Sequence, residues 1–429
     1  MGGCCSRDEA VDEALWNRRE EEEAEDEDAV RVREDGARVR LEGSCGFASM
    51  YTQQGLKGVN QDAMVLWEDF GGEKGTLFCG VFDGHGPYGH KVAGHVSKNL
   101  PSKLSLLLKQ PSFPEGNKGD ADLRSNTSSE SHEAGKHDSG IWLSSWKKTF
   151  TNAFEELDNE LSTNTSIDCI CSGATAVSIV KLREHLLVAN LGDSRAILGT
   201  RNEKNKLVPV QLTVDQKPNL PGEIERIKSC KGRVFALKEE PDVHRIWLPD
   251  DDCPGLAMAR AFGDFCLKDY GLISTPQLSS WRLTEKDEFV VLATDGLWDV
   301  LSNKQVIKTV SYAKNRADAA KLLVRRAIRT WMTRYPTSKI DDCAVICIFL
   351  KHPLLSTPPS IDGARYPPKP RQRSHSESFK TPRSGESSET EALGVNKDDW
   401  TALEGISRVN SLVKMPRFSS VLSWRRRSI

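Results

Sequence analysis

The chain has 429 residues, of which 38% are hydrophobic and 28% charged, and its 59 Lys and Arg nearly balance 61 Asp and Glu. This balance excludes a generally cationic nucleic-acid binder, so we expect no nucleic acid partner. The longest apolar run, Cys343 to Leu350, has eight residues, whereas a membrane-spanning helix needs roughly 18. The acidic N-terminus also lacks the apolar stretch of a secretory signal.

Short apolar runs alternate with helical patterns from about Leu41 to Leu350. In chain order, strands are expected at 63–67, 77–82, 174–180, 185–190, 196–198, 289–293 and 343–350. Helices are expected at 89–107, 142–161, 221–229 and 317–333. Between the first two helices, residues 111–140 are rich in Ser, Gly, Asp and Glu and are expected to form a loop insertion.

Composition divides the chain into three parts. Residues 1–40 carry a short N-terminal motif and an acidic segment, with eight carboxylates in the nine residues Glu20–Asp28, which predicts a disordered linker. Residues 41–351 are expected to form one large globular domain of roughly 280 residues without the insertion. Residues 352–429 are rich in Pro, Ser and Arg, and from Lys351 onward the chain has 14 Lys and Arg against eight Asp and Glu. This predicts a disordered basic tail.

The cysteines indicate a reducing environment. There are eleven, an odd number, and most lie in apolar runs where a small buried thiol is usual. Cys169 and Cys171 lack the second Cys or His pair that a zinc site requires. We therefore expect an intracellular protein.

Aspartates stand at the ends of several expected strands: Asp62, Asp83, Asp193, Asp295, Asp341 and Asp342. Carboxylates that converge repel one another unless a divalent cation neutralises them. Oxygen ligands favour Mg²⁺ or Mn²⁺ over zinc, and a glycine after Asp83 lets its own carbonyl approach an ion. Any one of these aspartates is otherwise an ordinary turn residue, and convergence in space cannot be read from spacing.

A second glycine pattern is a weaker signal. Gly84, Gly86 and Gly89 match G-x-G-x-x-G after a strand and before a helix. A dinucleotide-binding fold would place an acidic residue about 20 positions further on, at the end of a second strand. The stretch 103–109 offers none, so we reject a dinucleotide site.

Six motifs in order carry a family resemblance: Val81–Gly86 (VFDGHG), Ser172–Ala176 (SGATA), Ala189–Arg195 (ANLGDSR), Leu256–Asp264 (LAMARAFGD), Ala293–Asp299 (ATDGLWD) and Asp341–Val345 (DDCAV). Over about residues 47–350 the chain resembles the metal-dependent type 2C serine/threonine protein phosphatases, in a plant-like form. The resemblance implies an α+β fold of two packed antiparallel β-sheets flanked by α-helices. It also implies a phosphatase acting on phosphoserine and phosphothreonine in proteins.

The resemblance assigns roles to individual residues. Asp83 would bridge two Mg²⁺ or Mn²⁺ ions, the Gly84 carbonyl would bind one, and Asp295 and Asp341 would complete the other, with Asp342 as the alternative register to Asp341. Asp62 would hold metal-bound water, and His85 would be the general acid for the leaving oxygen, although a simple turn histidine is the alternative. Further residues match the positions of a weaker third ion: Asp193 and Asp299. A water bridging two ions becomes hydroxide near neutral pH and attacks phosphorus in line, without a phosphoenzyme.

Two positions depart from the family pattern of an arginine followed, after three residues, by Glu-Asp. Lys57 keeps the charge that attracts phosphate but loses the bidentate fork of arginine. Gln61 replaces a carboxylate with a neutral amide, which removes one negative charge. We therefore expect weaker metal affinity or an altered substrate preference, with activity retained.

The N-terminus predicts a membrane anchor. Met1–Ser6 (MGGCCS) fits the myristoylation pattern at Gly2, with a plain flexible terminus as the alternative. Because one myristoyl chain binds membranes only marginally, palmitoylation of Cys4 or Cys5 would supply a second anchor. The expected location is then peripheral, at the plasma membrane; otherwise it is the cytoplasm or nucleus. Three tail segments suit a basophilic kinase or an acidic lipid, with a solvated tail of no role as the alternative: Arg408–Ser411 (RVNS), Arg417–Ser419 (RFS) and Arg425–Ser428 (RRRS).

Three functional hypotheses follow. The first is a monomeric phosphoprotein phosphatase. The second is a membrane-tethered pseudophosphatase that binds phosphoproteins without turnover, which only Gln61 and Lys57 favour. The third is a hydrolase of small phosphate esters, which a narrow pocket would favour and which sequence cannot test.

Overall fold

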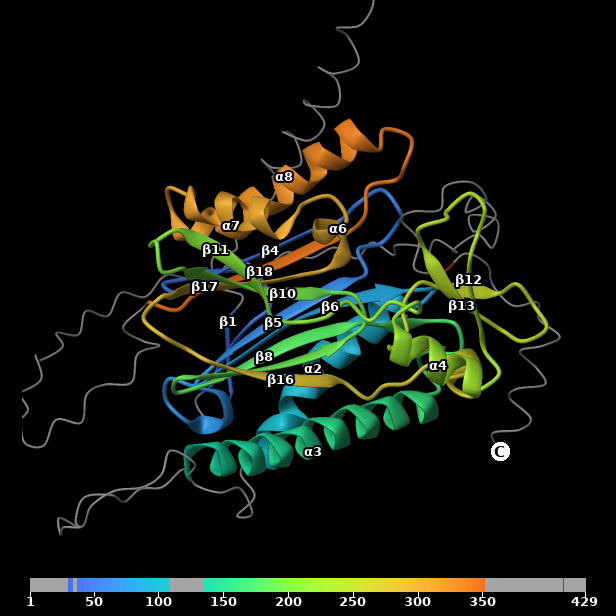
Figure 1. The fold of residues 1–429 in the computed structure, drawn as a ribbon, viewed down its shortest axis with the longest axis horizontal. Coiled ribbons are helices and arrows are strands. Elements are labelled where there is room, and N and C mark those ends of the chain that lie inside the picture. Colours follow the sequence, from blue (N-terminus) through green and yellow to red (C-terminus); the bar gives the residue numbers. More distant parts are fainter. Residues whose placement is uncertain (1–29, 34–36, 109–133, 352–411, 413–429) are drawn as a thin grey trace, which may run out of the picture.

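A computed structural model of the chain describes residues 30–33, 37–108, 134–351 and 412. Two antiparallel sheets lie face to face, and helices cover the outer face of each (Figure 1). Among the described residues, one sheet has nine strands. Its main order is β1 (Val30–Val32), β2 (Arg38–Arg40), β5 (Asp62–Glu68), β6 (Leu77–His85), β8 (Ala176–Leu182), β9 (His185–Leu191) and β16 (Gln277–Arg282). The short strands β7 (Gly173–Ala174) and β15 (Phe262–Gly263) extend it beside β6.

The second sheet has six strands in the described part of the chain. Their order is β11 (Leu207–Gln211), β10 (Arg195–Arg201), β17 (Asp287–Ala293), β18 (Cys343–Phe349), β4 (Ala48–Gln53) and β3 (Gly43–Cys45). A third, three-stranded sheet lies beside the sandwich together with one helix (Figure 1), and we call this unit the small subdomain: α4 (Pro221–Ser229), β12 (Arg233–Ala236), β13 (His244–Trp247) and β14 (Pro254–Leu256).

Helices close the sandwich on both sides. The longest ones are α2 (Gly89–Leu108) and α3 (Ala134–Thr163) on the first sheet, and α7 (Asn303–Ser311) and α8 (Ala319–Arg334) on the second. Shorter elements connect the strands: η1 (Phe70–Gly72), α5 (Phe265–Lys268), α6 (Asp295–Trp298) and η2 (Arg316–Asp318). None of the described helices is both long and apolar enough to span a bilayer.

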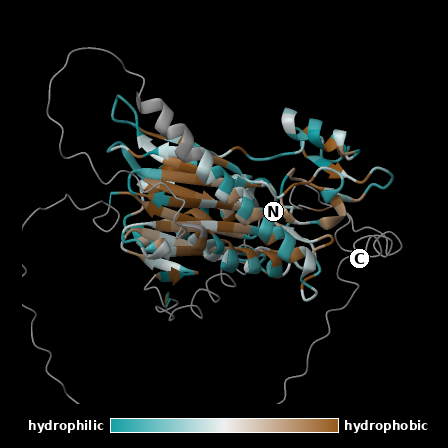
Figure 2. Ribbon diagram, turned by 90° about the horizontal axis from the view of Figure 1, so that it is seen from below, coloured by the Kyte–Doolittle hydropathy of each residue, from teal (hydrophilic) through white to brown (hydrophobic). Residues whose placement is uncertain are grey.

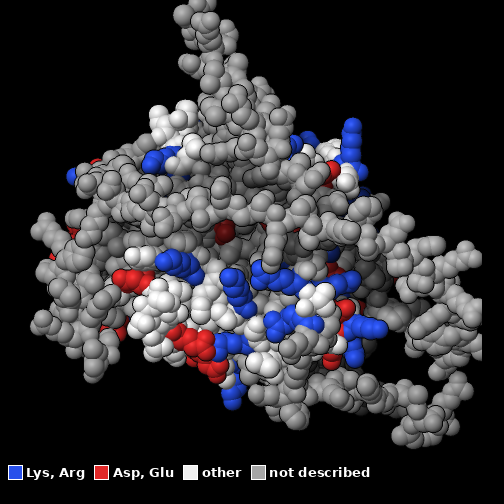
Figure 3. Space-filling view, turned by 180° about the vertical axis from the view of Figure 1, so that it is seen from behind, with Lys and Arg blue, Asp and Glu red and all other residues white. Residues whose placement is uncertain are grey.

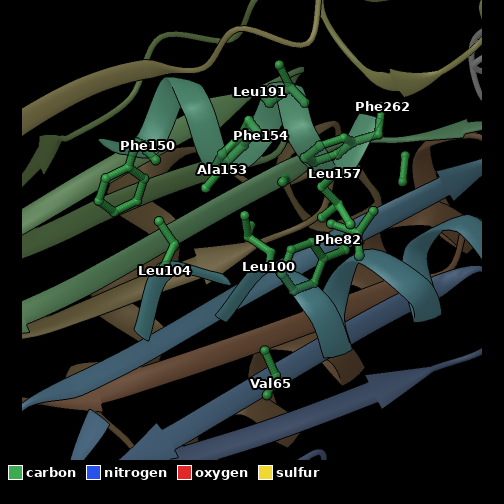
Figure 4. Packing of buried hydrophobic residues seen from close by; sticks show 14 of the residues in the cluster. Val65, Phe82, Leu100, Leu104, Phe150, Ala153, Phe154, Leu157, Leu191 and Phe262 are labelled. Carbon is green, nitrogen blue, oxygen red and sulfur yellow. The ribbon is translucent and has the colours of Figure 1, made fainter. Parts of the chain in front are cut away.

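The alternation of side chains along each strand divides the core into layers. All nine residues of β6 are buried, because this strand is covered on both faces. Phe78 and Phe82 pack toward α2 and α3, where Figure 4 shows Phe82 near Leu100. Leu77 and Val81 pack instead into the core between the two sheets. Figure 2 accordingly shows hydrophobic strands stacked inside the sandwich.

The surface mixes both signs of charge. On the face seen in Figure 3, Lys and Arg side chains lie next to Asp and Glu side chains in the described part of the molecule. This agrees with the near balance of acidic and basic residues in the sequence.

The predicted fold class, two packed antiparallel sheets flanked by helices, is confirmed, but two boundaries differ. Strands β1 and β2 lie within residues 1–40, which the sequence assigned to the linker, and β2 pairs with β5. Arg38 and Arg40 both form ion pairs with Glu68. The charged composition of this stretch therefore concealed β2, which lies between β1 and β5. Helix α3 begins at Ala134, inside the expected loop 111–140, because a nucleated helix extends at little cost per residue.

Candidate active site

Strand ends from both sheets meet at one end of the core between them. In β6 the residues that face the second sheet, Leu77 and Val81, lead by alternation to Asp83. Asp62 begins β5 and pairs directly with Asp83 in the strand register. Both carboxylates therefore lie where the apolar layer between the sheets ends.

The second sheet brings more carboxylates to the same place. The hydroxyl of Thr294, directly after β17, donates to Asp62 Oδ2 at 2.8 Å and so links the two sheets. Asp295 follows Thr294 as the first residue of α6, and Asp299 is the C-cap of that helix. Together with the aspartates before β18 and between β9 and β10, these residues form what we call the carboxylate cluster: Asp62, Asp83, Asp193, Asp295, Asp299 and Asp341.

Asp341 and Asp342 have different surroundings. The buried carboxylate of Asp342 accepts the backbone N–H of Gly55 at 2.7 Å on one oxygen and that of Gln61 at 2.8 Å on the other. Asp342 thereby fastens the segment before β5 to β18. Asp341 instead pairs with Lys57 Nζ at 2.5 Å on the side of the other carboxylates. Both oxygens of Asp342 are already used by backbone N–H groups, so Asp341 is the better candidate for a metal ligand.

Burial and mutual repulsion disfavour ionisation of the carboxylates in the cluster. Burial, and then the negative charges of Asp341 and Asp193, raise the pKa of Asp295 to about 7. Burial also raises the pKa of Asp341 to about 6, although Lys57 opposes the rise. The pKa values of Asp83 and Asp62 lie well above the ordinary range for the same reason, burial followed by neighbouring carboxylates. The pKa of Asp299 is also raised, but its side chain reaches solvent, so water screens the effect.

Two lysines partly neutralise this charge. Burial would lower the pKa of Lys57, but Asp341, Asp295 and other carboxylates raise it overall. Lys217 Nζ contacts Asp193 Oδ2 at 2.5 Å, and its pKa is raised too, because Asp193 and Asp299 outweigh burial. Sequence reasoning missed Lys217, because it lies in the segment before α4 and 24 positions from Asp193, and no local pattern connects the two.

The donor set suits a hard divalent cation. All the acidic side chains of the cluster offer oxygen, which Mg²⁺ and Mn²⁺ prefer. Asp193 Oδ1 is buried without a hydrogen-bond partner among the described residues, so it has an oxygen to spare. As they stand, no three His, Cys, Asp or Glu side chains in the described ranges are grouped closely enough to hold an ion.

His85 forms a buried pair with Asp264. Its Nε2 lies 2.5 Å from Asp264 Oδ2, both side chains are almost inaccessible to water, and Nδ1 has no partner in the described part of the chain. Asp264 adopts a left-handed backbone conformation (φ 50°), and its N–H donates to the Ser172 carbonyl. The motifs that contain Ser172 and His85 therefore both contact Asp264. The sequence showed Asp264 inside a motif but assigned it no role; only the fold brings it within reach of His85, 179 positions away.

The end of β6 requires glycine at Gly84, and the turn that follows is braced by Gln61. A Cβ on Gly84 would lie 2.4 Å from the Gly89 carbonyl oxygen, so the close approach of two backbones excludes a side chain. Gln61 Nε2 donates to the Gly86 carbonyl at 3.2 Å. Its Oε1 is buried without a hydrogen-bond partner among the described residues. The predicted lipidation residues, Gly2, Cys4 and Cys5, lie outside the described residues.

Comparisons with known proteins show the family of the chain. Residues 49–333 match the family model described as Protein phosphatase 2C. The chain is 54% identical over 389 residues to probable protein phosphatase 2C 73 of Oryza sativa subsp. japonica, covering 89% of each protein. It is 48% identical over 434 residues to probable protein phosphatase 2C 33 of Arabidopsis thaliana, covering 89% of this chain and 88% of that protein.

Solved structures share the fold. The serine-threonine phosphatase 2C from Toxoplasma gondii superimposes with a TM-score of 0.61 at 24% identity, over 73% of this chain and 98% of that one. A C. elegans sex determining protein gives a TM-score of 0.53 at 19% identity, over 73% and 68% of the two chains. The chain therefore belongs to the protein phosphatase 2C family and is a metal-dependent serine/threonine phosphatase that acts on phosphoproteins.

Proposed function

We propose that the carboxylate cluster holds two divalent cations, Mg²⁺ or Mn²⁺. Asp83 would contact both ions, the Gly84 carbonyl would bind one, and Asp295 and Asp341 would bind the other. The observation that carries this proposal is the convergence of six aspartate side chains. Burial and neighbouring carboxylates raise the pKa of five of them: Asp62, Asp83, Asp295, Asp299 and Asp341. Asp193 and Asp299 would contribute to a weaker third site, for which Lys217 competes through its ion pair with Asp193.

Bound cations would supply the activation of the attacking water and the neutralisation of the phosphoryl charge. Lys57, released from Asp341 when that carboxylate turns to an ion, would bind the phosphoryl oxygens as a point charge. His85 would donate a proton to the leaving serine or threonine oxygen, and Asp264 would hold the imidazole in place. No side chain of the chain needs to become phosphorylated.

The test is turnover of a phosphothreonine peptide by the purified protein after chelation and after addition of Mg²⁺ or Mn²⁺ in the millimolar range. We expect no turnover in EDTA, recovery with either ion, and loss of nearly all activity in Asp83→Asn. Asp269→Asn, at the exposed C-cap of α5, is the matched control and should keep full activity. Turnover that survives exhaustive chelation would falsify the metal mechanism. Phosphopeptide binding without turnover at any metal concentration would favour the pseudophosphatase. Turnover of p-nitrophenyl phosphate alone would favour a small-ester hydrolase.

We also propose that the enzyme is a monomer held at the plasma membrane through an acylated N-terminus. The support is the sequence Met1–Ser6, in which Gly2 suits myristoylation and Cys4 and Cys5 suit palmitoylation. The acidic segment that follows would repel an anionic membrane surface and keep the catalytic domain away from it.

A further inference from the structure

The core of the small subdomain includes one residue from far along the chain. Its buried side chains come from α4, the small sheet and the segment that leads to Asp264, and include Ile227, Ile246 and Met258. Four partly buried hydrophobic residues pack against these: Ile170, Val234, Leu248 and Leu412. The first three belong to the catalytic domain. Leu412 belongs to the C-terminal tail, and it is half-buried there.

We propose that Leu412 anchors the C-terminal tail of the same molecule to the small subdomain. The surface is the apolar rim formed by Ile170, Val234 and Leu248, and the occupant is the tail segment around Leu412. This contact joins two parts of the chain that the sequence analysis treated as independent.

The length of the intervening chain permits docking within one molecule. Sixty residues, 352–411, separate the catalytic domain from Leu412. A flexible chain of that length has a root-mean-square span of roughly 45 Å, comparable to the size of the domain. Tethering at this distance raises the effective concentration of the anchor to about the millimolar range, so a weak contact suffices.

The tail around Leu412 and the small subdomain carry complementary charges. From Arg408 to Arg417 the tail contains three basic residues and no acidic one. On the small subdomain, Asp250–Asp252 begin two positions after Leu248, and Asp250 and Asp252 are exposed. The Asp252 carboxylate already pairs with Arg233 at 2.8 Å, whereas Asp250 and Asp251 extend the negative surface beside the rim. Opposite charges beside an apolar anchor fix which segment of the tail docks.

The docked position lies close to segments that line the active site. Met258 and Ala261 belong to the small subdomain core, and the same segment reaches the His85 partner Asp264 three positions later. The Ala259 N–H donates to the Gln216 carbonyl at 2.7 Å, directly before Lys217. The tail is thus attached beside segment 258–264, which contacts Gln216 next to Lys217 and ends at the His85 partner Asp264. The proposal concerns the tail alone and does not depend on the metal mechanism.

Limited trypsin digestion of the full-length protein tests the proposal, with the rate measured bond by bond by mass spectrometry. Docking should slow cleavage after Arg408 and Lys414, which flank the anchor, relative to cleavage after Arg373, which lies in the same tail. Half burial of a leucine side chain corresponds to roughly a fivefold preference for the docked state. We therefore expect Leu412→Ala to accelerate cleavage at both flanking bonds by about fivefold.

Two further variants make the test specific. Leu248→Ser changes the rim and leaves the tail sequence intact, and it should accelerate the same two bonds. Leu403→Ala, a matched tail control, should change neither. Because Leu412 lies outside the catalytic domain, its variant tests the proposal even if Leu248→Ser fails to fold. Flanking-bond rates that stay unchanged in Leu412→Ala overturn the proposal. Protection that rises with protein concentration from 1 to 50 µM also overturns it, in favour of docking between two copies.

Discussion

Replacing Asp295 by asparagine should have opposite effects on activity and on stability. The variant loses a proposed metal ligand, so turnover should fall to near zero. Without metal, however, the variant should be more stable than the original protein above neutral pH. The reason is that the folded chain holds the Asp295 carboxylate, when ionised, among other buried carboxylates, and asparagine carries no charge.

The size of the effect follows from the pKa. Asp295 has a pKa of about 7 in the folded chain and an ordinary value of 3.8. Because the folded pKa is raised, the folded state binds the proton more tightly, and the stability that this proton provides is lost as the pH rises from about 4 to about 7. These two pKa values differ by about 3, and each pKa unit corresponds to about 1.36 kcal/mol. The change in the free energy of unfolding is therefore at most about 4 kcal/mol. Since Asp295 is only half-buried and shares its shift with Asp341, we expect about 2 kcal/mol, or ~3 °C for a domain of this size.

Thermal unfolding of both proteins at pH 5 and pH 8, each in EDTA and in Mn²⁺, measures this prediction. In EDTA the variant should melt higher than the original at pH 8, and the difference should shrink toward pH 5. In Mn²⁺ at 100 times its dissociation constant, the original should gain about 2.7 kcal/mol at pH 8 and the variant much less. Asp269→Asn, at an exposed carboxylate, should match the original throughout. If Asp295→Asn were no more stable than the original at pH 8 in EDTA, the carboxylate repulsion that underlies the metal site would be refuted.

Four further outcomes are expected. Gln61→Glu should lower the Mn²⁺ concentration for half-maximal turnover severalfold, and an unchanged metal dependence would place residue 61 outside the metal environment. Asp264→Asn should slow turnover of a phosphothreonine peptide by roughly 10- to 100-fold. It should slow hydrolysis of p-nitrophenyl phosphate much less, because that leaving group needs no proton from His85. Equal losses of turnover on the two substrates would indicate that Asp264 has a merely structural role. Gly2→Ala should move the enzyme from the membrane to the soluble fraction of cells without changing phosphopeptide turnover, whereas a wild-type protein that takes up no myristate label would contradict the anchor. Ser411→Asp should speed trypsin cleavage beside the proposed tail anchor, because it adds negative charge to a segment that would dock next to Asp250 and Asp251.

Local patterns predicted much of the fold. Helix α4 was expected at 221–229 and is found there, and β5, β9 and β17 agree with the expected runs to within two residues. These elements have clear apolar periodicity and turn residues at their ends. Helix α7 was missed although Ser302 and Gln305 form a capping box, because its apolar face is only three residues wide. Strands β12 and β13 were missed because half-buried charged residues such as Arg233 interrupt the apolar pattern.

The candidate site divides in the same way. Asp83 and Asp295 stand out in the sequence because each ends an apolar run within a recognisable motif, and the fold brings the two carboxylates together. The choice between Asp341 and Asp342 could not, since only the fold shows that the Asp342 carboxylate accepts two backbone N–H groups. The role of Lys217 could not be predicted either. A lysine in a polar segment looks like solvated surface until the fold places its ammonium group on Asp193.

Gln61 connects these observations to the chemistry of the site. Its amide nitrogen braces the turn that carries His85, and its amide oxygen is already buried without a hydrogen-bond partner among the described residues. A glutamate there would lose the donor to Gly86 and place a charge where that oxygen lies, which is costly unless a cation neutralises it. The cost is therefore largest in the metal-free enzyme and is relieved on binding, so the substitution should raise metal affinity while lowering metal-free stability. We therefore expect that Gln61 lowers the metal affinity of this chain and stabilises its metal-free fold, which carries one less buried charge.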